Sequence, residues 1–361
     1  MGILATRLHV SRYRSFDEFT LELASGVNIL VGRNAVGKTN LVEGLQLLTA
    51  GASFRKPAPI ELVREGCASG AATLVLEGDG RLLDMGLEVT EGKRHFLKNG
   101  KRTNAAGVRG VLPSVLFCPD HLDMVKRGAR VRRDALDSFG VQLNAQYGKL
   151  LSAYERTVEQ RNNLLKECVD PALLEVWDES LAGTGASLLM HRRALLARIR
   201  ERVVETYRVI APHECPDVAY QSTIGDLPES REEIVEQFLA VLAERRAEEL
   251  RRGMTLVGPH RDEILFTIDG RSARDFGSQG QQRSFVLAWK LAEVQVTNDI
   301  LGRYPLLLLD DVMSELDGAR RDAIMGFISG GIQTVITTTN LGYFGSDVLE
   351  HAKVVHIGDE E

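Results

Sequence analysis

Residues 27–48 read VNILVGRNAVGKTNLVEGLQLL, and this stretch decides the fold. It starts with an apolar run, Val27 to Val31, that predicts a buried strand. The strand leads into a glycine-rich loop and then a helix whose Leu41, Val42, Leu45 and Leu48 share one face. A strand, G-x-x-x-x-G-K-[ST] and a helix in this order are typical of a phosphate-binding loop. The stretch therefore predicts nucleotide binding by an α/β fold.

Each residue type in the loop suits phosphate chemistry. Gly32 and Gly37 allow backbone N–H groups to turn inward around phosphate oxygens. Lys38 supplies a positive charge to the β and γ phosphates, and Thr39 offers a hydroxyl to Mg²⁺. The predicted ATP contacts of this loop are Gly32, Arg33, Asn34, Ala35, Val36, Gly37, Lys38, Thr39 and Asn40.

A second motif, YPLLLLDDVMSELD at residues 304–317, places two acids after a leucine run. This pattern predicts a buried parallel strand whose carboxyl end faces a ligand. Asp310 is predicted to hold Mg²⁺ through its water shell, and Asp311 to orient or deprotonate the water that attacks the γ-phosphate. Lys38 and Asp311 are thus the candidate catalytic residues. The alternative is a simple turn after a buried strand, but two adjacent acids are costly to bury without a cation.

The composition excludes several classes of protein. The chain has 361 residues, 44% of them apolar and 26% charged, which suits a folded protein with room for two domains. Acidic residues outnumber basic ones by 50 to 44, so DNA binding requires a local basic patch and not a basic tail. The cysteines are scattered and form no Cys-x-x-Cys pair, which favours a reducing, cytoplasmic location. No apolar run is long enough to span a bilayer, which favours the same location. The cysteines are Cys67, Cys118, Cys168 and Cys215.

Hydrophobic periodicity divides the chain into two regions. Before residue 118, alternation at Leu4, Thr6, Leu8 and Val10 predicts half-buried strands, and Asn99 with Gly100 predicts a two-residue hairpin turn in an antiparallel sheet. From 118 to 251, apolar residues recur at helical spacing between charges. We therefore predict an α/β head from residues 1–117 and 252–361, with a mainly helical second lobe, 118–251, inserted between them. VAYQSTIG, residues 218–225, predicts a strand returning to the head, so the boundary near 210–252 is soft.

A third motif, DFGSQGQQRSFVLAWKLAEVQV at residues 275–296, opens a helix with Ser278 and Gly280. A helix N-terminus is an anion site, although Ser278 alone is also an ordinary helix cap. The order along the chain is phosphate loop, SQGQQR, Asp-Asp, SELD and then QTVITTT. This order resembles that of ABC-type ATPases.

Lys38 and Ser278 are 240 residues apart, and the sequence between them is predicted to be largely helical. In this long separation the chain resembles the chromosome-maintenance branch of that class. Within it the chain resembles the RecF family of bacterial DNA replication and repair proteins over nearly its whole length. The motifs that carry the resemblance are YRSF (13–16), GRNAVGKTN (32–40), VLFCPDHLDMVK (115–126), RRDALD (132–137), QRNNLLK (160–166), WDESLAGTGA (177–186), TLVGPHRDE (255–263), GSQGQQRS (277–284) and LLLLDDVMSELD (306–317).

The resemblance implies a DNA-binding ATPase that dimerises when ATP is bound. It implies that Ser278, Gln279, Gly280, Gln281 and Arg283 form a signature acting on the partner subunit's γ-phosphate, that Ser314 and Asp317 form the D-loop, and that Arg14 contacts the nucleotide. Asp311 stands where the wider ABC class has glutamate, so we expect slow hydrolysis. Thr337–Thr339 stand where many ABC proteins have a switch histidine, which leaves γ-phosphate sensing to hydroxyls or another residue.

Two basic runs in the predicted helical lobe are candidates for DNA phosphate contacts. The candidate residues are Lys126, Arg127, Arg130, Arg132, Arg133, Arg192 and Arg193. The alternative is a solvated basic face, which is the commoner meaning of a charge run.

The sequence thus predicts an ATP- and Mg²⁺-dependent homodimer on duplex or gapped DNA. By resemblance alone, it assists recombinase loading in recombinational repair with a RecR-like mediator. An SMC-like DNA-structural ATPase with long coiled coils is disfavoured, because no heptad pattern persists. The alternative that the chain is a nucleotide-gated binding module that does not hydrolyse ATP is left open by the sequence.

Overall fold

The structure, a computed structural model, describes residues 2–78, 80–167 and 171–358; Cys168 lies outside the described residues. The chain divides into two compact units. The head unit comprises Met1–His121 and Lys290–Glu361, and the helical unit comprises Leu122–Trp289. No helix in the described ranges is both long and apolar enough to cross a membrane.

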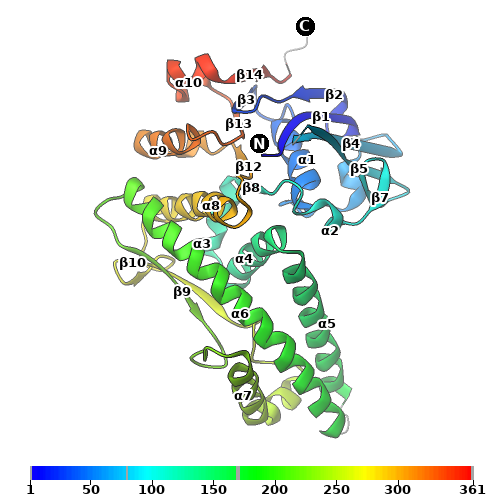
Figure 1. The fold of residues 1–361 in the computed structure, drawn as a ribbon, viewed down its shortest axis with the longest axis vertical. Helices are drawn as coiled ribbons and strands as arrows, with labels where there is room; N and C mark the ends of the chain where they lie inside the picture. The colour runs from blue at the N-terminus through cyan, green and yellow to red at the C-terminus, as the bar shows by residue number, and fades with distance from the viewer. Residues whose placement is uncertain (1, 79, 168–170, 359–361) are drawn as a thin grey trace. The chain divides into compact units, whose positions relative to one another are not determined.

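The head unit contains two β-sheets (Figure 1). The larger sheet is antiparallel with strand order β2-β1-β4-β5-β6-β7. Its strands are β1 (Leu4–Tyr13), β2 (Phe16–Glu22), β4 (Ser69–Gly78), β5 (Arg81–Thr90), β6 (Lys93–Lys98) and β7 (Lys101–Thr103). The second sheet is parallel with order β14-β3-β13-β12-β8. Its strands are β3 (Val27–Val31), β8 (Ser114–Phe117), β12 (Leu306–Asp310), β13 (Thr334–Thr338) and β14 (Lys353–His356).

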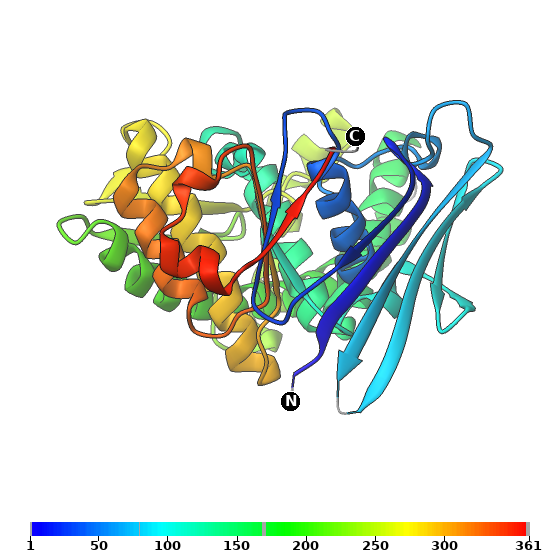
Figure 2. The same cartoon turned by 90° about the horizontal axis from the view of Figure 1, so that it is seen from above.

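Helix α1 (Lys38–Ala50) packs between these two sheets and contacts strands of both (Figure 2). This position explains why Leu47 is as fully buried as the predicted core face of Leu41 and Leu45. Gln333 links the sheets: its amide accepts a hydrogen bond from the Ala5 N–H at 2.9 Å and donates to the carbonyl oxygens of Ala5 and Ala24. The phosphate loop therefore leads into a helix that is largely buried within the unit.

Apart from α1 and the second half of α8 (Gln279–Leu301), which begins in the helical unit, the helices of the head unit are short. They are the 3₁₀ helices η1 (Pro59–Leu62), η3 (Met313–Glu315) and η4 (Leu341–Tyr343) and the α-helices α2 (Ala105–Val108), α9 (Gly318–Ile328) and α10 (Ser346–His351). The 3₁₀ helix η2 (Pro119–Leu122) ends at the first residue of the helical unit.

The predicted strand pattern holds for most of β1 and β2, with one exception. Leu8 and Val10 are buried as expected, but Ala5 is buried in place of Leu4 and Thr6. The pairing of β1 with β4 shifts by one residue between Ala5 and Arg7, which reverses the faces on either side of the shift. The predicted hairpin turn is confirmed, because Asn99 and Gly100 have φ values of 50° and 71°.

The helical unit is mainly helical, as the sequence predicts. Its helices are α3 (Asp123–Lys126), α4 (Ala129–Leu143), α5 (Ala145–Glu167), α6 (Pro171–Ile210) and α7 (Arg231–Arg252), together with the start of α8 (Gln279–Leu301). Residues of α5, α6 and α7 form its apolar core, among them Tyr154, Leu189 and Phe238. Its small sheet has the order β11-β10-β9, from β9 (Pro216–Gln221), β10 (Glu263–Ile268) and β11 (Arg271–Ser272).

The predicted boundary at residue 252 differs from the observed division. The strand expected within VAYQSTIG exists as β9, but it pairs with β10 inside the helical unit. Backbone pairing with β9 therefore retains β10 and β11 in the helical unit, and the chain returns to the head unit only within α8, at Lys290. β10 and β11 are therefore a correction to the predicted head, because residues 252–289 belong to the helical unit.

Candidate nucleotide-binding site

The phosphate loop joins the carboxyl end of β3 to the N-terminus of α1. Gly37 has a φ of 108°, a left-handed conformation that glycine adopts without strain. At Gly32 a Cβ atom would lie 2.3 Å from the Ile357 carbonyl oxygen, so a larger residue would displace the backbone. Both motif glycines are thus required by local geometry, and they shape the tight turn that precedes the positive end of the α1 dipole.

The Lys38 side chain lies over its own loop. Its Nζ donates hydrogen bonds to the carbonyl oxygens of Gly32 at 2.8 Å and Arg33 at 2.7 Å. Burial lowers the pKa of this ammonium, while the carboxylates of Asp311 and Asp310 act in the opposite direction. A cation held between the loop and two acids is suited to a polyanionic ligand.

Asp310 lies at the carboxyl end of β12, where it meets two hydroxyl groups. Its Oδ1 accepts hydrogen bonds from Thr39 at 3.0 Å and from Thr337 at 2.7 Å. Burial raises the pKa of Asp310, whereas these two hydrogen bonds lower it. A hydroxyl beside a carboxylate matches the oxygen ligands that Mg²⁺ prefers. The arrangement therefore fits a divalent cation at the predicted position.

Asp311 follows with an unusual backbone. Its φ of 54° is left-handed, which costs a residue with a side chain about 1 kcal/mol. Its N–H donates to the Thr337 Oγ1 at 2.9 Å, so one hydroxyl fixes both acids. Thr337 was expected only as one of several hydroxyls at the switch position, and the structure shows that it orients the acid pair.

The predicted residues converge on one pocket of about 280 Å³. Its lining consists of Asn34, Ala35, Gly37, Lys38, Thr39, Asn40, Arg55, Asp311 and Thr337. Gly32, Arg33 and Val36 belong to the loop but not to this lining. A larger hollow of about 660 Å³ lies between α6 and β9 of the helical unit and contains no phosphate-loop residue.

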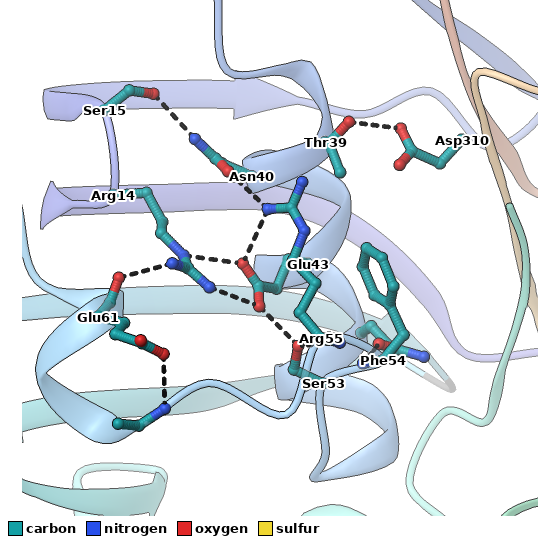
Figure 3. A network of polar contacts seen from close by, with 12 residues as sticks. Arg14, Ser15, Thr39, Asn40, Glu43, Ser53, Phe54, Arg55, Glu61 and Asp310 are labelled. Carbon is teal, nitrogen blue, oxygen red and sulfur yellow. Dashed lines mark hydrogen bonds and ion pairs between the residues drawn. The ribbon is translucent and has the colours of Figure 1, made fainter. Parts of the chain in front are cut away.

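Arg14 is a correction to the predicted contacts, because its guanidinium is bound inside the head unit (Figure 3). Its Nε and Nη2 donate to the two carboxylate oxygens of Glu43, each at 2.9 Å, and its Nη1 donates to the Glu61 carbonyl oxygen at 2.7 Å. The Glu43 side chain is fully buried, so a paired cation is needed there. Arg14 therefore neutralises a buried acid and does not line the pocket.

Arg55 is the pocket residue that sequence reasoning missed. Its Nη1 donates to the Asn40 Oδ1 at 2.9 Å and lies 3.5 Å from a Glu43 carboxylate oxygen (Figure 3). Asn40 in turn donates to the Ser15 hydroxyl at 3.0 Å. One arginine in a loop has no motif or periodicity to single it out; only the folded chain brings it beside Asn40. The pocket lining thus contains a second cation, Arg55, in addition to Lys38.

The predicted signature begins α8 in the helical unit. The Ser278 hydroxyl accepts a hydrogen bond from the Gln281 N–H at 3.1 Å, and the Gln281 side chain accepts one from the Ser278 N–H at 2.8 Å. This reciprocal pair is a capping box. It accounts for Ser278 as a cap and leaves Gln279, Gly280 and Arg283 in the first turn or directly after it.

The predicted D-loop residues make local contacts in the head unit. The Ser314 hydroxyl donates to the Asp311 carbonyl oxygen at 3.1 Å, and Asp317 caps α9 by accepting from the Arg320 N–H at 3.0 Å. Ser314 thereby adds a contact to the strained backbone of Asp311.

The predicted DNA contacts in the helical unit need correction. Arg132 is buried and bidentate to Glu263 at 2.9 and 2.8 Å, and Arg192 is likewise paired with Asp137. The Arg133 Nη1 donates to the Asp262 carbonyl oxygen at 2.5 Å. Arg132 and Arg192 are therefore neutralised and buried within the unit, whereas Arg133 is half-buried.

The other four predicted DNA contacts are more accessible. Arg193 is half-buried and bonds the Pro228 carbonyl oxygen. Arg127 and Arg130 are exposed beside Asp123 and Asp134, and Lys126 is exposed.

Comparison with known proteins places this geometry in a family. A model of an AAA domain matches residues 7–94. DNA replication and repair proteins RecF from Gloeobacter violaceus and Acaryochloris marina are 38% and 35% identical to the chain, covering 99% and 97% of it and 97% and 96% of those proteins. The RecF protein of Symbiobacterium thermophilum is 40% identical over 92% of this chain and 91% of its own.

Solved structures agree. One, of "the recombination mediator protein RecF-ATPrS in RecFOR pathway", has a TM-score of 0.90 at 29% identity and covers 99% of this chain and 97% of that chain. A RecF-ATP structure has a TM-score of 0.87 at 30% identity, with 94% of each chain covered. The Smc head domain from Pyrococcus furiosus, at 14% identity, 99% and 94% coverage and a TM-score of 0.57, shares the fold. The chain therefore belongs to the RecF family of DNA replication and repair proteins, with an ABC-type ATPase head and an inserted helical lobe.

Proposed function

We propose that this protein is an ATP-dependent DNA-binding protein of recombinational repair and replication. The observation that carries the proposal is the acid pair of β12, in which Asp310 is bonded to Thr39 of the phosphate loop. Thr39 and Asp310 come from distant parts of the sequence and together provide the oxygen atoms for Mg²⁺ beside Lys38. The family's RecF-ATP structure supports ATP as the nucleotide.

The residues of the pocket have distinct proposed tasks. Lys38 and the loop N–H groups bind the phosphates, and Thr39 with Asp310 holds Mg²⁺. Bound Mg²⁺ would neutralise charge on the phosphates during transfer. Asp311 orients the attacking water and accepts its proton. Because an aspartate is one methylene shorter than the glutamate of most ABC proteins, we expect weak ATPase activity.

We further propose that ATP closes a homodimer. The capped N-terminus of α8 presents the positive end of its dipole to an anion, which suits the γ-phosphate held by a partner subunit. The closed dimer would retain duplex or gapped DNA, and hydrolysis would release it. By family resemblance, the DNA-bound form cooperates with a RecR-like mediator in recombinase loading.

The first test is a Lys38→Met variant. Loss of the ammonium should abolish ATP binding and, with it, ATP-induced dimerisation and ATP-dependent DNA binding. Isothermal titration calorimetry measures the first and light scattering the second, with Lys149→Met, an exposed lysine of α5, as the matched control. Dimerisation that still responds to ATP in the Lys38→Met variant would contradict the switch.

An Asp311→Asn variant separates an ATPase from a nucleotide-gated module without turnover. Asparagine keeps the size of the side chain, and the backbone N–H that bonds Thr337 is unchanged, but the amide cannot accept a proton from water. We expect ATP affinity within about threefold of wild type and phosphate release lowered about 100-fold or more, the range of general-base effects. Equal phosphate release by both proteins would remove Asp311 from the mechanism.

A further inference from the structure

An uninterrupted basic segment lies in the head unit. Residues 92–119 contain six lysines or arginines and no aspartate or glutamate, although the whole chain has more acids than bases. Five of the six lie on one hairpin, formed by β6 and β7 around the turn at Asn99 and Gly100. We define this basic hairpin by Lys93, Arg94, Lys98, Lys101 and Arg102.

The cations of the basic hairpin face solvent. Lys93, Arg94, Lys101 and Arg102 are exposed, and Lys98 is half-buried. None of the five forms an ion pair with any residue in the described ranges. This distinguishes them from Arg132 and Arg192 of the helical unit, whose charges are neutralised by Glu263 and Asp137.

Strand register places like charges directly opposite each other. Lys98 pairs with Lys101 across the turn. Repulsion between two like charges in this position weakens a hairpin unless a bound anion reduces it. On β5 the residues opposite Arg94 and Lys98 are Val89 and Met85, so that strand offers no acid on this face. Lys101 shares this face through its pairing with Lys98, whereas Lys93 and Arg102 alternate onto the other face, which also carries the exposed β5 acids Asp84 and Glu88.

The position of the hairpin makes this charge accessible to a long ligand. β7 is an edge strand of the six-stranded sheet, so on one side the hairpin pairs with no other strand of the described residues. The buried Phe96 anchors β6 to the core, and the Arg94 guanidinium lies 5.5 Å from the centre of its ring. A rigid, two-stranded basic edge suits a regular row of phosphates better than it suits one small anion.

From this geometry we propose that the basic hairpin is a DNA-binding surface that contacts the phosphate backbone of duplex DNA. The proposal deepens the proposed function by assigning its DNA contacts to β6 and β7 of the head unit. Because these contacts are with phosphates, the surface would bind without sequence preference and with strong dependence on salt.

The experiment compares two fourfold variants with the same change in net charge. The hairpin variant carries Lys93→Gln, Arg94→Gln, Lys101→Gln and Arg102→Gln. The control variant carries Lys149→Gln, Lys166→Gln, Arg208→Gln and Arg251→Gln, all exposed residues of helices in the helical unit. Fluorescence anisotropy with a labelled duplex, with ATP and over a range of salt concentrations, gives the dissociation constant and its salt slope.

We expect the hairpin variant to bind duplex DNA about 100-fold more weakly near 0.1 M salt, with a slope of log K against log salt smaller in magnitude by about 3.6, since each of its four lost phosphate contacts contributes about 0.9. Its ATP affinity and ATP-induced dimerisation should equal those of wild type, which shows that the head unit is intact. The control variant should retain the wild-type slope.

Several outcomes would overturn the proposal. A hairpin variant with the control's affinity and slope would show that these cations do not contact DNA, and equal losses in both variants would reduce the effect to net charge. Unchanged DNA binding together with lost binding to polyglutamate would assign the surface to an acidic protein. A different result would be wild-type DNA binding that is equally strong with and without ATP but is lost in the hairpin variant. That result would contradict the ATP switch of the proposed function and would support the assignment of the hairpin to DNA.

Discussion

A Ser278→Asp variant should bind ATP as wild type does yet fail to dimerise or hydrolyse it. Aspartate is as good a helix cap as serine, so the carboxylate can still accept a hydrogen bond from the Gln281 N–H that now bonds Ser278. The same carboxylate places a negative charge at the N-terminus of α8, where we propose the partner's γ-phosphate binds. Calorimetry should give an unchanged ATP affinity, and light scattering with ATP should give a monomer.

The matched control is Ser278→Asn. Asparagine caps a helix equally well and has nearly the same shape as aspartate but carries no charge. We expect this variant to retain part of the ATP-induced dimerisation. Because both variants keep the helix cap, the difference in dimerisation between Ser278→Asp and Ser278→Asn measures the electrostatic repulsion alone.

Mixing Ser278→Asp with Lys38→Met tests whether the signature acts across the dimer. In a heterodimer one composite site combines both changes, whereas the other joins an intact phosphate loop to an intact signature. Phosphate release should therefore return in the mixture although each variant alone is inactive. Failure of the Ser278→Asp monomer to bind ATP would instead place the signature in its own subunit's site. Inactive heterodimers would mean either that the two sites are strictly coupled or that the signature does not act in trans.

The residues that line the candidate pocket could mostly be picked out from the sequence, because the patterns that identify them are local. The phosphate loop is contiguous, and the acids of β12 follow a leucine run, so residue order alone places them at one sheet edge. Arg14 and Arg55 could not be assigned in this way. Their roles depend on Glu43, a buried acid on α1 whose two arginine neighbours come from separate loops, and only packing reveals that Glu43 binds Arg14 by two hydrogen bonds.

The same limit applies to the predicted DNA contacts at Arg132 and Arg192, which the structure shows to be buried. A basic run on a helix looks solvated when its acids are distant in sequence, as Glu263 is from Arg132. In the basic hairpin, by contrast, lysines and arginines are interspersed with Phe96 and Leu97 as in any half-buried strand, so no charge run draws attention to them. The predicted domain boundary differs from the observed one for a related reason. Pairing of β9 with β10 joins two segments that the composition of the sequence assigns to different domains.

Replacing Arg192 with methionine should destabilise the helical unit and leave the salt dependence of DNA binding unchanged. The Arg192 side chain is 3% exposed and donates to both carboxylate oxygens of Asp137, at 2.9 and 2.6 Å. Its removal leaves that acid with only the Tyr147 hydroxyl as a hydrogen-bonding side chain among the contacts described. Breaking a buried pair in this way costs about 3–5 kcal/mol. Urea unfolding followed by circular dichroism measures the loss.

The adjacent Arg193 provides the control, since its side chain is 30% exposed and its acid partner Glu229 is almost fully exposed. Arg193→Met should cost at most about 1 kcal/mol, as surface pairs do. Adding Asp137→Asn to Arg192→Met should recover part of the stability, because asparagine can still accept the Tyr147 hydrogen bond without burying an unpaired charge. If Arg192→Met unfolds like wild type and instead reduces the salt slope of DNA binding, Arg192 contacts phosphate and its pairing with Asp137 is not what holds the helical unit together.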